Sequence, residues 1–373
     1  MRLSVRLAVR LSGWWVLACC LALPALAQEL KTKNVVLIVL DGLRWQEVFT
    51  GADPLLISNE KAGGSWTALP KLKSQFWSDE VHARRRILMP FLWETVATHG
   101  QLFGNRRLGS QAVVTNPFWI SYPGYNEITT GVADRRIRTN EFGVNPNTTV
   151  FEWLNDLPDY HDQVEIVGNW ASFHDIFNEP RSHLLIRSGE TLLDPSATLP
   201  AARQLRELYE TTTRLEDEDP MDSFVHLVLR DRLMEHHPRV LFVGYGDIDN
   251  WAHLGRYDAL LQTVQHADAF IKDLWEQMQA IPQYRDQTTF IITTDHGRGS
   301  GPLLWREHGV KEPGSENIWI AVMGPDTPAL GERTHIAPVT QGQIAATVAA
   351  VLGRDFRRFK PKAAPPLPIF KAP

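Results

Sequence analysis

Cysteine is nearly absent from this chain of 373 residues, which contains only Cys19 and Cys20. Both lie inside the apolar run LSGWWVLACCLALPALA at residues 11–27. If processing removes that run, the mature chain has no thiol. Disulfide bonds, zinc–thiolate sites and a cysteine nucleophile are then excluded.

Acidic residues are missing from the first 27 positions, where three arginines precede the apolar run. An arginine-rich start, a short apolar core and the small residues of Ala25-Leu26-Ala27 are together typical of a secretory signal peptide. We therefore expect residues 1–27 to be cleaved and the product to be periplasmic or secreted. A retained membrane anchor is the alternative, but a span needs about 20 apolar residues and this run contains Pro24. No stable membrane span is expected after cleavage.

An excess of positive charge is also missing, because the formal net charge is −5 and loss of the three signal arginines lowers it to −8. A negative chain is a poor general binder of nucleic-acid polymers and other polyanions. Any phosphate group must therefore be held by a local site. The roughly 346 residues that remain suffice for one large α/β domain with insertions or for two domains.

Several short segments are almost continuously apolar, as expected for strands of a sheet that is covered on both faces. Between them, residues 256–280 carry apolar side chains at three- and four-residue steps, which predicts an amphipathic helix. Alternating strands and helices predict an α/β fold, a three-layer α/β/α sandwich with a mostly parallel central sheet. The predicted strands are NVVLIVL at 34–40, QVEIV at 163–167, VLFVGY at 240–245, TFIITT at 289–294 and IWIAVM at 318–323.

Two stretches interrupt this alternation, at about residues 51–86 and 172–237. Insertions of this kind usually cover the strand ends and shape a pocket, although surface decoration is the alternative. The second insertion contains an acidic run at 216–219. We expect one catalytic domain over residues 28–360 and an extended, proline-rich tail over 361–373.

Acidic and histidine side chains follow three of the predicted strands. Asp41 comes directly after VVLIVL, Asp249 and His253 come shortly after VLFVGY, and Asp295-His296 follows TFIITT. Open α/β sheets build their sites at the carboxyl ends of strands. Because a plain turn or helix cap would explain any one of these residues alone, the prediction of a metal site rests on their combination.

The second of these sets has competing members. Asp249 and His253 are four residues apart, so one helical turn would place both on the same face. Asp247 is a nearby competitor or auxiliary acid. His308, in WREHGV, would complete the set, and His335, in RTHIAPV, is the alternative that we disfavour. Carboxylate and imidazole donors at this spacing suit zinc or manganese.

A nucleophile for such a site is present in NPFWISYPGYNEITTG. Pro123 suits the first turn of a helix and Gly131 suits its end, which places Ser121 at a helix N-terminus. There the helix dipole and a bound cation would both favour the alkoxide over the hydroxyl. A serine that only caps the helix is the alternative.

Taken together, these segments resemble the alkaline phosphatase superfamily, and within it the type I phosphodiesterase and nucleotide pyrophosphatase branch. The segment VVLIVLDGLR is similar to the first strand of that branch with its metal-binding aspartate, and SYPGYNEITTG to its nucleophile segment. DNWAH, TTDHG and EHG resemble its remaining ligand motifs, in the same order, over roughly residues 34–325. In this chain Ser121 stands where diesterases usually have threonine, and the arginine of the sulfatase motif is missing.

The resemblance implies a mechanism with two divalent metal ions, for which zinc is favoured and manganese is the alternative. It implies that Ser121 attacks phosphorus to form a phosphoserine, and that Asn140, which maps only loosely, holds a phosphate oxygen. The implied ligands are Asp41, Asp295 and His296 for one ion and Asp249, His253 and His308 for the other.

The function implied by the resemblance is an exported, dinuclear-metal-dependent phosphohydrolase that cleaves small-molecule phosphate monoesters or diesters. A phosphoryl or phosphoethanolamine transferase, or a mutase, on the same scaffold is the first alternative. A sulfatase-like hydrolase and a non-catalytic binding protein are disfavoured. Phe118, Trp119 and Trp251 flank the proposed site, and stacking of one of them on an aromatic leaving group is a further hypothesis.

Overall fold

The computed structural model describes residues 30–193, 200–213 and 219–370. The predicted signal peptide, with Cys19 and Cys20, and the acidic residues 216–218 lie outside the described residues.

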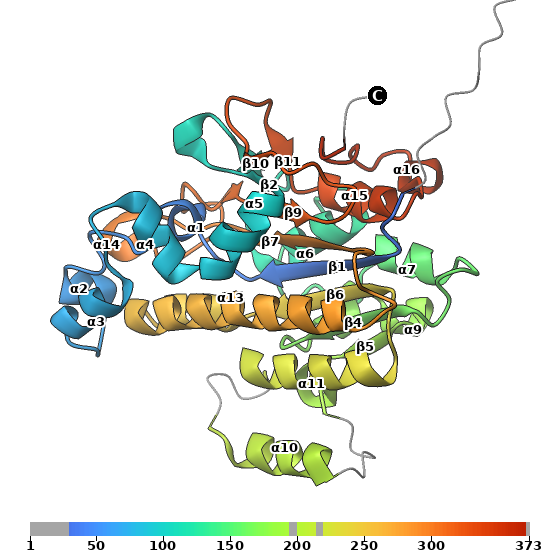
Figure 1. Ribbon diagram of the computed structural model, residues 1–373, viewed down its shortest axis with the longest axis horizontal. Coiled ribbons are helices and arrows are strands. Elements are labelled where there is room, and N and C mark those ends of the chain that lie inside the picture. The colour runs from blue at the N-terminus through green and yellow to red at the C-terminus, as the bar shows by residue number, and fades with distance from the viewer. Residues whose placement is uncertain (1–29, 194–199, 214–218, 371–373) are drawn as a thin grey trace, which may run out of the picture.

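A central sheet of eight strands organises the chain (Figure 1). The neighbours β7, β1, β6, β4 and β5 are parallel, whereas β9 is antiparallel to both β7 and β2. The predicted α/β fold with a mostly parallel sheet is confirmed. The order across the sheet is β10 (Gly331–Glu332), β2 (Gly100–Phe103), β9 (Ile320–Met323), β7 (Thr288–Thr293), β1 (Asn34–Leu40), β6 (Val240–Tyr245), β4 (Val164–Gly168) and β5 (Leu185–Arg187).

Strand β1 shows why the sheet needs helices on both faces. All seven of its residues are buried. Val36 and Ile38 belong to one hydrophobic core, whereas Val35 and Leu37 belong to a second core on the other face. Because successive side chains of a strand point to opposite faces, an unbroken apolar run requires cover on both sides.

Helices provide this cover and complete three layers, with α13 on one side of β1 and α15 on the other in Figure 1. The face with Val36 is covered by α1 (Trp45–Thr50), α4 (Val81–Leu88), the π-helix η1 (Leu92–Val96), α11 (Asp222–Glu235) and α13 (Tyr257–Ala280). The opposite face is covered by α6 (Ser121–Thr130), α7 (Val150–Asn155), α8 (Phe173–Ile176) and α15 (Gln343–Val351).

Shorter elements connect these layers. They are α2 (Glu60–Gly63), α3 (Leu69–Phe76), α5 (Ala97–His99), η2 (Arg106–Leu108), α9 (Glu179–Ser182), η3 (Gly189–Thr191), α10 (Pro200–Thr211), α12 (Asp247–His253), α14 (Gly301–Leu304) and α16 (Phe356–Phe359). A second, three-stranded sheet has the order β11 (Val339–Thr340), β3 (Ala112–Val113) and β8 (Asn317–Ile318).

Four of the five predicted strands coincide with β1, β4, β6 and β7 to within one residue. The fifth, at 318–323, is divided between the two sheets, because Ile318 ends β8 and Ile320 begins β9. Between them, Trp319 is fully buried and its indole Nε1 donates a hydrogen bond to the carbonyl of Leu43 at 3.1 Å. Trp319 therefore separates the two strands. A continuous apolar pattern in the sequence does not reveal this division.

The two stretches that were expected to interrupt the alternation of strands and helices pack against the rest of the domain. Residues 51–86 form α2, α3 and most of α4, which contact α14 and α1. Residues 172–237 include β5 at the sheet edge and α11 on one face. Near the C-terminus, Leu367 and Ile369 are buried, and Gln101 Nε2 donates to the carbonyl of Ile369. Among the described residues, no helix combines the length and apolar character needed to cross a membrane.

Candidate active site

The candidate site lies at the carboxyl ends of three adjacent parallel strands, β7, β1 and β6. Asp41 follows β1 directly, and Asp295 lies two residues beyond β7. Helix α12 begins two residues after β6 and carries Asp249 and His253. Because parallel strands end at the same edge of a sheet, residues more than 200 positions apart in the sequence meet here.

The first group of side chains is buried, and only Asp41 reaches the cavity. Asp41, Asp295 and His296 are buried, and one ligand atom from each lies within 4.8 Å of the others. Tyr125 donates its hydroxyl to Asp41 Oδ2 at 3.0 Å, and the Gly42 N–H donates to Asp295 Oδ1 at 3.0 Å. The other carboxylate oxygens, Asp41 Oδ1 and Asp295 Oδ2, are buried without a hydrogen-bond partner. They lie 3.6 and 3.3 Å from His296 Nε2.

The electrostatics of this group call for a cation. Burial, and then the nearby carboxylate of Asp295, raise the pKa of Asp41 to about 7, and burial raises the pKa of Asp295 to about 6. Burial also lowers the pKa of His296, which favours the neutral imidazole. Two buried carboxylates with unpaired oxygens and no charged histidine are costly unless a positive ion lies between them. The residues therefore fit a divalent metal ion.

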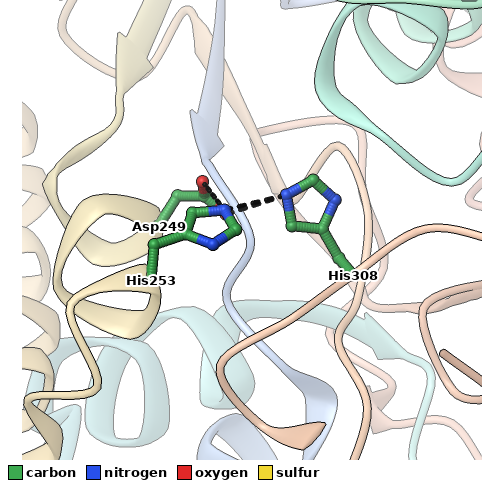
Figure 2. A group of neighbouring side chains, drawn as sticks. All are labelled: Asp249, His253 and His308. Atoms are coloured by element: carbon green, nitrogen blue, oxygen red, sulfur yellow. Dashed lines mark hydrogen bonds and ion pairs between the residues drawn. The ribbon is translucent and has the colours of Figure 1, made fainter.

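The second group, Asp249, His253 and His308, is more open to solvent. Figure 2 shows Asp249 and His253 on one turn of α12, facing His308 from a loop on the other side. His253 Nε2 lies 3.1 Å from Asp249 Oδ2 and 3.0 Å from His308 Nε2. His308 Nδ1 donates to the carbonyl of Trp119 at 3.3 Å, so His308 Nε2 presents a lone pair in the neutral ring. Burial lowers the pKa of His308 and keeps the ring neutral.

This arrangement also fits a metal ion. The lone pair of His308 Nε2, one nitrogen of His253 and a carboxylate oxygen of Asp249 converge within 4.8 Å, and such a donor set suits zinc. His335, the alternative to His308, is exposed and lies beside Gly109, outside both groups. Asp247 is also outside them, because its Oδ2 accepts the main-chain N–H of Asp222.

Asp249 connects the two groups. Its Oδ1 lies 4.0 Å from His296 Nε2 and 3.9 Å from His308 Nε2. The same oxygen accepts a hydrogen bond from Nη2 of Arg298, whose side chain is completely buried. Burial lowers the pKa of Arg298 to about 9. Arg298 was not predicted from the sequence, because a charged residue is expected at the surface unless its buried partner is known.

Ser121 is the first residue of α6 and is 6% exposed. Its Oγ lies 3.3 Å from His296 Nε2. The predicted bounds of the helix are confirmed, with Pro123 in the first turn and Gly131 as a left-handed C-cap. Helix α6 approaches the first group closely, because a Cβ at Gly124 would lie 2.5 Å from the carbonyl oxygen of Asp295.

Asn140 lies in the loop after α6. Its Oδ1 accepts the main-chain N–H of Tyr122 at 3.0 Å, which orients the amide at the start of α6. The side chain borders a cavity of about 330 Å³ that adjoins both groups. The cavity is lined by Asp41, Ser121, Asn140, Glu141, Asn169, Trp170, Ser172, Asp219, Gly246, Asp249, Asn250, His253 and His308. Its aromatic lining residue is thus Trp170 rather than Phe118, Trp119 or Trp251.

No family model and no curated protein matches this sequence. Solved structures match its fold. A protein in the alkaline phosphatase superfamily from Vibrio parahaemolyticus matches at 14% identity and a TM-score of 0.51, over 87% of this chain and 67% of that one. The lipoteichoic acid synthase LtaP from Listeria monocytogenes matches at 12% and 0.52, over 87% and 72%. The phosphonate monoester hydrolase SpPMH from Silicibacter pomeroyi matches at 13% and 0.50, over 90% and 78%. The chain has an alkaline phosphatase-like fold.

Proposed function

We propose that this chain is an exported phosphohydrolase that cleaves phosphate mono- or diesters with two divalent metal ions and Ser121 as the nucleophile. The observation that carries the proposal is the position of Ser121 Oγ, 3.3 Å from His296 Nε2 at the start of α6. This hydroxyl contacts a member of the first group of potential ligands, and Ser121 lines the same cavity as the second group. The fold shared with a phosphonate monoester hydrolase supports a hydrolase.

The proposed ligands are the two groups described above, Asp41, Asp295 and His296, and Asp249, His253 and His308. Zinc suits their nitrogen and oxygen donors, and manganese is the alternative. When bound, such ions supply Lewis acidity that favours the serine alkoxide and offsets the charge of the phosphoryl group.

The protein itself prepares the nucleophile. The N-terminal end of α6 carries a partial positive charge that favours the alkoxide of Ser121. Ser121 Oγ attacks phosphorus, so that a bond forms between Oγ and phosphorus while the bond to the leaving alcohol oxygen breaks. The Ser121 proton passes to solvent and the leaving oxygen takes up a proton. Water then cleaves the bond between Oγ and phosphorus, which releases phosphate from a monoester substrate or a phosphate monoester from a diester substrate and restores the hydroxyl.

Two other residues hold the reacting groups in place. The Asn140 amide is oriented by the hydrogen bond from Tyr122 N–H to its Oδ1, which leaves Nδ2 to donate to a phosphate oxygen. The neutral imidazole of His296 is oriented by donation from its Nδ1 to the carbonyl of Gly297 at 2.9 Å, so Nε2 faces Ser121. Fixed donors aimed at developing charge account for much of the catalysis of phosphoryl transfer.

Export and the domain boundaries belong to the same proposal. The arginine-rich start and apolar run support cleavage after Ala27 and a periplasmic or secreted enzyme. The catalytic domain is assigned to residues 28–360, because both ligand groups and Ser121 lie within it.

The direct test is turnover by the purified mature chain, residues 28–373, loaded with zinc or manganese. We expect hydrolysis of 4-nitrophenyl phosphate, bis(4-nitrophenyl) phosphate or both, and loss of that activity in Ser121→Ala. Hydrolysis of 4-nitrophenyl sulfate alone would replace the proposal with a sulfatase. Transfer of the phosphoryl group to an added alcohol in preference to water would replace it with a transferase.

A further inference from the structure

Beyond the ligand groups, the cavity has a wall with a distinct chemistry. It is built from amides, a hydroxyl and an indole, at Asn169, Trp170, Ser172 and Asn250. Within the part of the chain that the structure describes, no lysine or arginine lines the cavity. The wall therefore offers hydrogen bonds but no positive charge.

Asn169 is the most informative residue of this wall. It follows β4, and its main-chain groups are paired, with N–H donating to the Gly244 carbonyl and C=O accepting from Gly189 N–H. The residue is 3% exposed and lines the cavity. Its amide can therefore exchange hydrogen bonds with water or with a ligand in the cavity.

Gly246 makes room for the Asn169 amide. A Cβ at position 246 would lie 2.2 Å from Asn169 Nδ2, so a side chain there would displace the amide. Trp170 is held at a fixed angle by edge contacts with Tyr122 and Phe173, at centroid distances of 6.4 and 6.0 Å. The wall is thus preorganised, which lowers the cost of binding.

The charge around this wall is negative. Glu141 lies at the rim and is exposed, and Asp219 lines the cavity and accepts the N–H of Ala171 at 3.2 Å. An anionic group placed against this wall, away from the proposed metal ions, would meet two carboxylates and no cationic side chain of the described residues. The leaving group of a nucleoside polyphosphate is itself a negatively charged phosphate. Against this wall, that phosphate would find no positively charged partner.

We infer that this wall binds the leaving alcohol of the substrate and that this alcohol carries hydroxyl groups and no negative charge, as in a phosphate ester of a polyol or sugar. The inference rests on the proposed function. An asparagine amide both donates and accepts, which matches a hydroxyl group, and the face of Trp170 suits the apolar side of a polyol.

A matched pair of substrates tests the charge preference. Glycerol 3-phosphate and 3-phosphoglycerate share a three-carbon skeleton, and a hydroxymethyl group in one is a carboxylate in the other. We expect kcat/KM to favour glycerol 3-phosphate by about tenfold or more. Equal or faster turnover of the anionic member would overturn the inference.

Two charge-reversal variants test whether the preference for an uncharged leaving alcohol comes from the wall. Glu141→Lys should lower the ratio of kcat/KM between the two members of the pair by about tenfold, because it replaces repulsion of the carboxylate by attraction. Glu276→Lys, at an exposed position on α13, makes the same change in net charge away from the cavity and should leave the ratio unchanged. An equal response of the ratio in both variants would contradict a local effect.

Asn169→Ala should reduce kcat/KM for glycerol 3-phosphate several-fold more than for 4-nitrophenyl phosphate, which has no hydroxyl on its leaving group. Asn169→Asp keeps the shape of the side chain and should lower kcat/KM for 3-phosphoglycerate further. It replaces the alanine variant in this test if that variant is unstable. Unselective hydrolysis of all substrates would overturn the inference and leave the proposed function standing. Hydrolysis of none of them by the metal-loaded protein would overturn both.

Discussion

His308 Nδ1 donates a hydrogen bond to the main-chain carbonyl of Trp119, two residues before Ser121. Trp119 has a positive φ of 52°, a conformation that a bulky residue rarely adopts and that turns this carbonyl toward the imidazole. The loop before Ser121, the proposed nucleophile, therefore orients one of the proposed metal ligands through its backbone. The contact does not involve the side chain of Ser121.

Replacement of Ser121 should therefore separate turnover from metal binding. Ser121→Ala removes Oγ but leaves the Trp119 carbonyl and His308 in place, so we expect a loss of kcat of at least about 10³-fold with unchanged metal content. Steady-state kinetics and elemental analysis of the same preparation measure both quantities. Ser121→Thr, which keeps a hydroxyl, should restore part of the activity. Full activity in the alanine variant would exclude the covalent mechanism.

Gly42 should tolerate no side chain. Its φ is 62°, and a Cβ would lie 2.3 Å from Asp249 Oδ1 and 2.9 Å from Arg298 Nε. Gly42→Ala should lower the melting temperature and weaken metal binding by about 10- to 100-fold, because it displaces a proposed ligand. Isothermal titration and thermal melts measure the two effects.

Gly143→Ala is the matched control, since Gly143 has a φ of 79° and no atom within 4 Å of the new Cβ. It should cost only the left-handed backbone strain, about 1 kcal/mol, and leave metal affinity unchanged. Similar metal affinities in the two variants would show that the close approach at Gly42 is unimportant.

Arg298 should stabilise the metal-free protein more than the metal-bound protein. Its buried guanidinium is an ion-pair partner of Asp249, and removing one member of a buried pair costs about 3–5 kcal/mol. In the presence of a chelator, Arg298→Met should therefore lower the free energy of unfolding by about 3–5 kcal/mol. Saturating zinc should reduce the deficit by half or more, because a bound cation also neutralises Asp249. An equal deficit with and without zinc would contradict a shared role for this carboxylate.

Asp268, on α13 and away from the site, should make stability depend on pH. Its carboxylate accepts the N–H groups of Phe91 and Leu92 at 2.7 and 2.9 Å, yet burial raises its pKa to about 7. Since the folded-state pKa lies above the unfolded value near 3.8, folding disfavours the ionised form, and stability is lost as pH rises from about 4 through 7. The loss is a few kcal/mol at most.

Asp268→Asn removes this titration. The stability advantage of the natural protein over the variant should therefore shrink between pH 4 and 7 and stay constant at higher pH. Urea unfolding of both proteins at several pH values measures that difference and cancels the titration of other groups. A difference that does not vary with pH would show that the carboxylate keeps its ordinary pKa in the folded chain.

Local sequence patterns were sufficient for the central strands of the sheet and for the proximity of the six candidate ligands. Unbroken apolar runs marked β1, β6 and β7, and strand adjacency then brought Asp41, Asp249 and Asp295 to one edge. Ser121 was placed at a helix start because proline and glycine mark the two ends of α6.

Other parts of the site depend on contacts that no local pattern encodes. Arg298 is charged, and a charged residue is expected at the surface until its buried partner Asp249 is known. Tyr125 orients Asp41, and Asn169 faces the cavity, only because distant strands and helices bring them there. The short strand β5 and the division at Trp319 were missed for the same reason.

Two distinct metal sites should adjoin Ser121, and a zinc titration of the metal-free protein counts the ions that they bind. We expect two ions per chain in the natural protein, one in Asp295→Ala, one in His253→Ala, and two in His335→Ala. Hydrolysis of 4-nitrophenyl esters should appear only when both sites are filled. Fewer than one ion per chain in the natural protein, with no hydrolysis in zinc or manganese, would show that these residues do not form a dinuclear metal site.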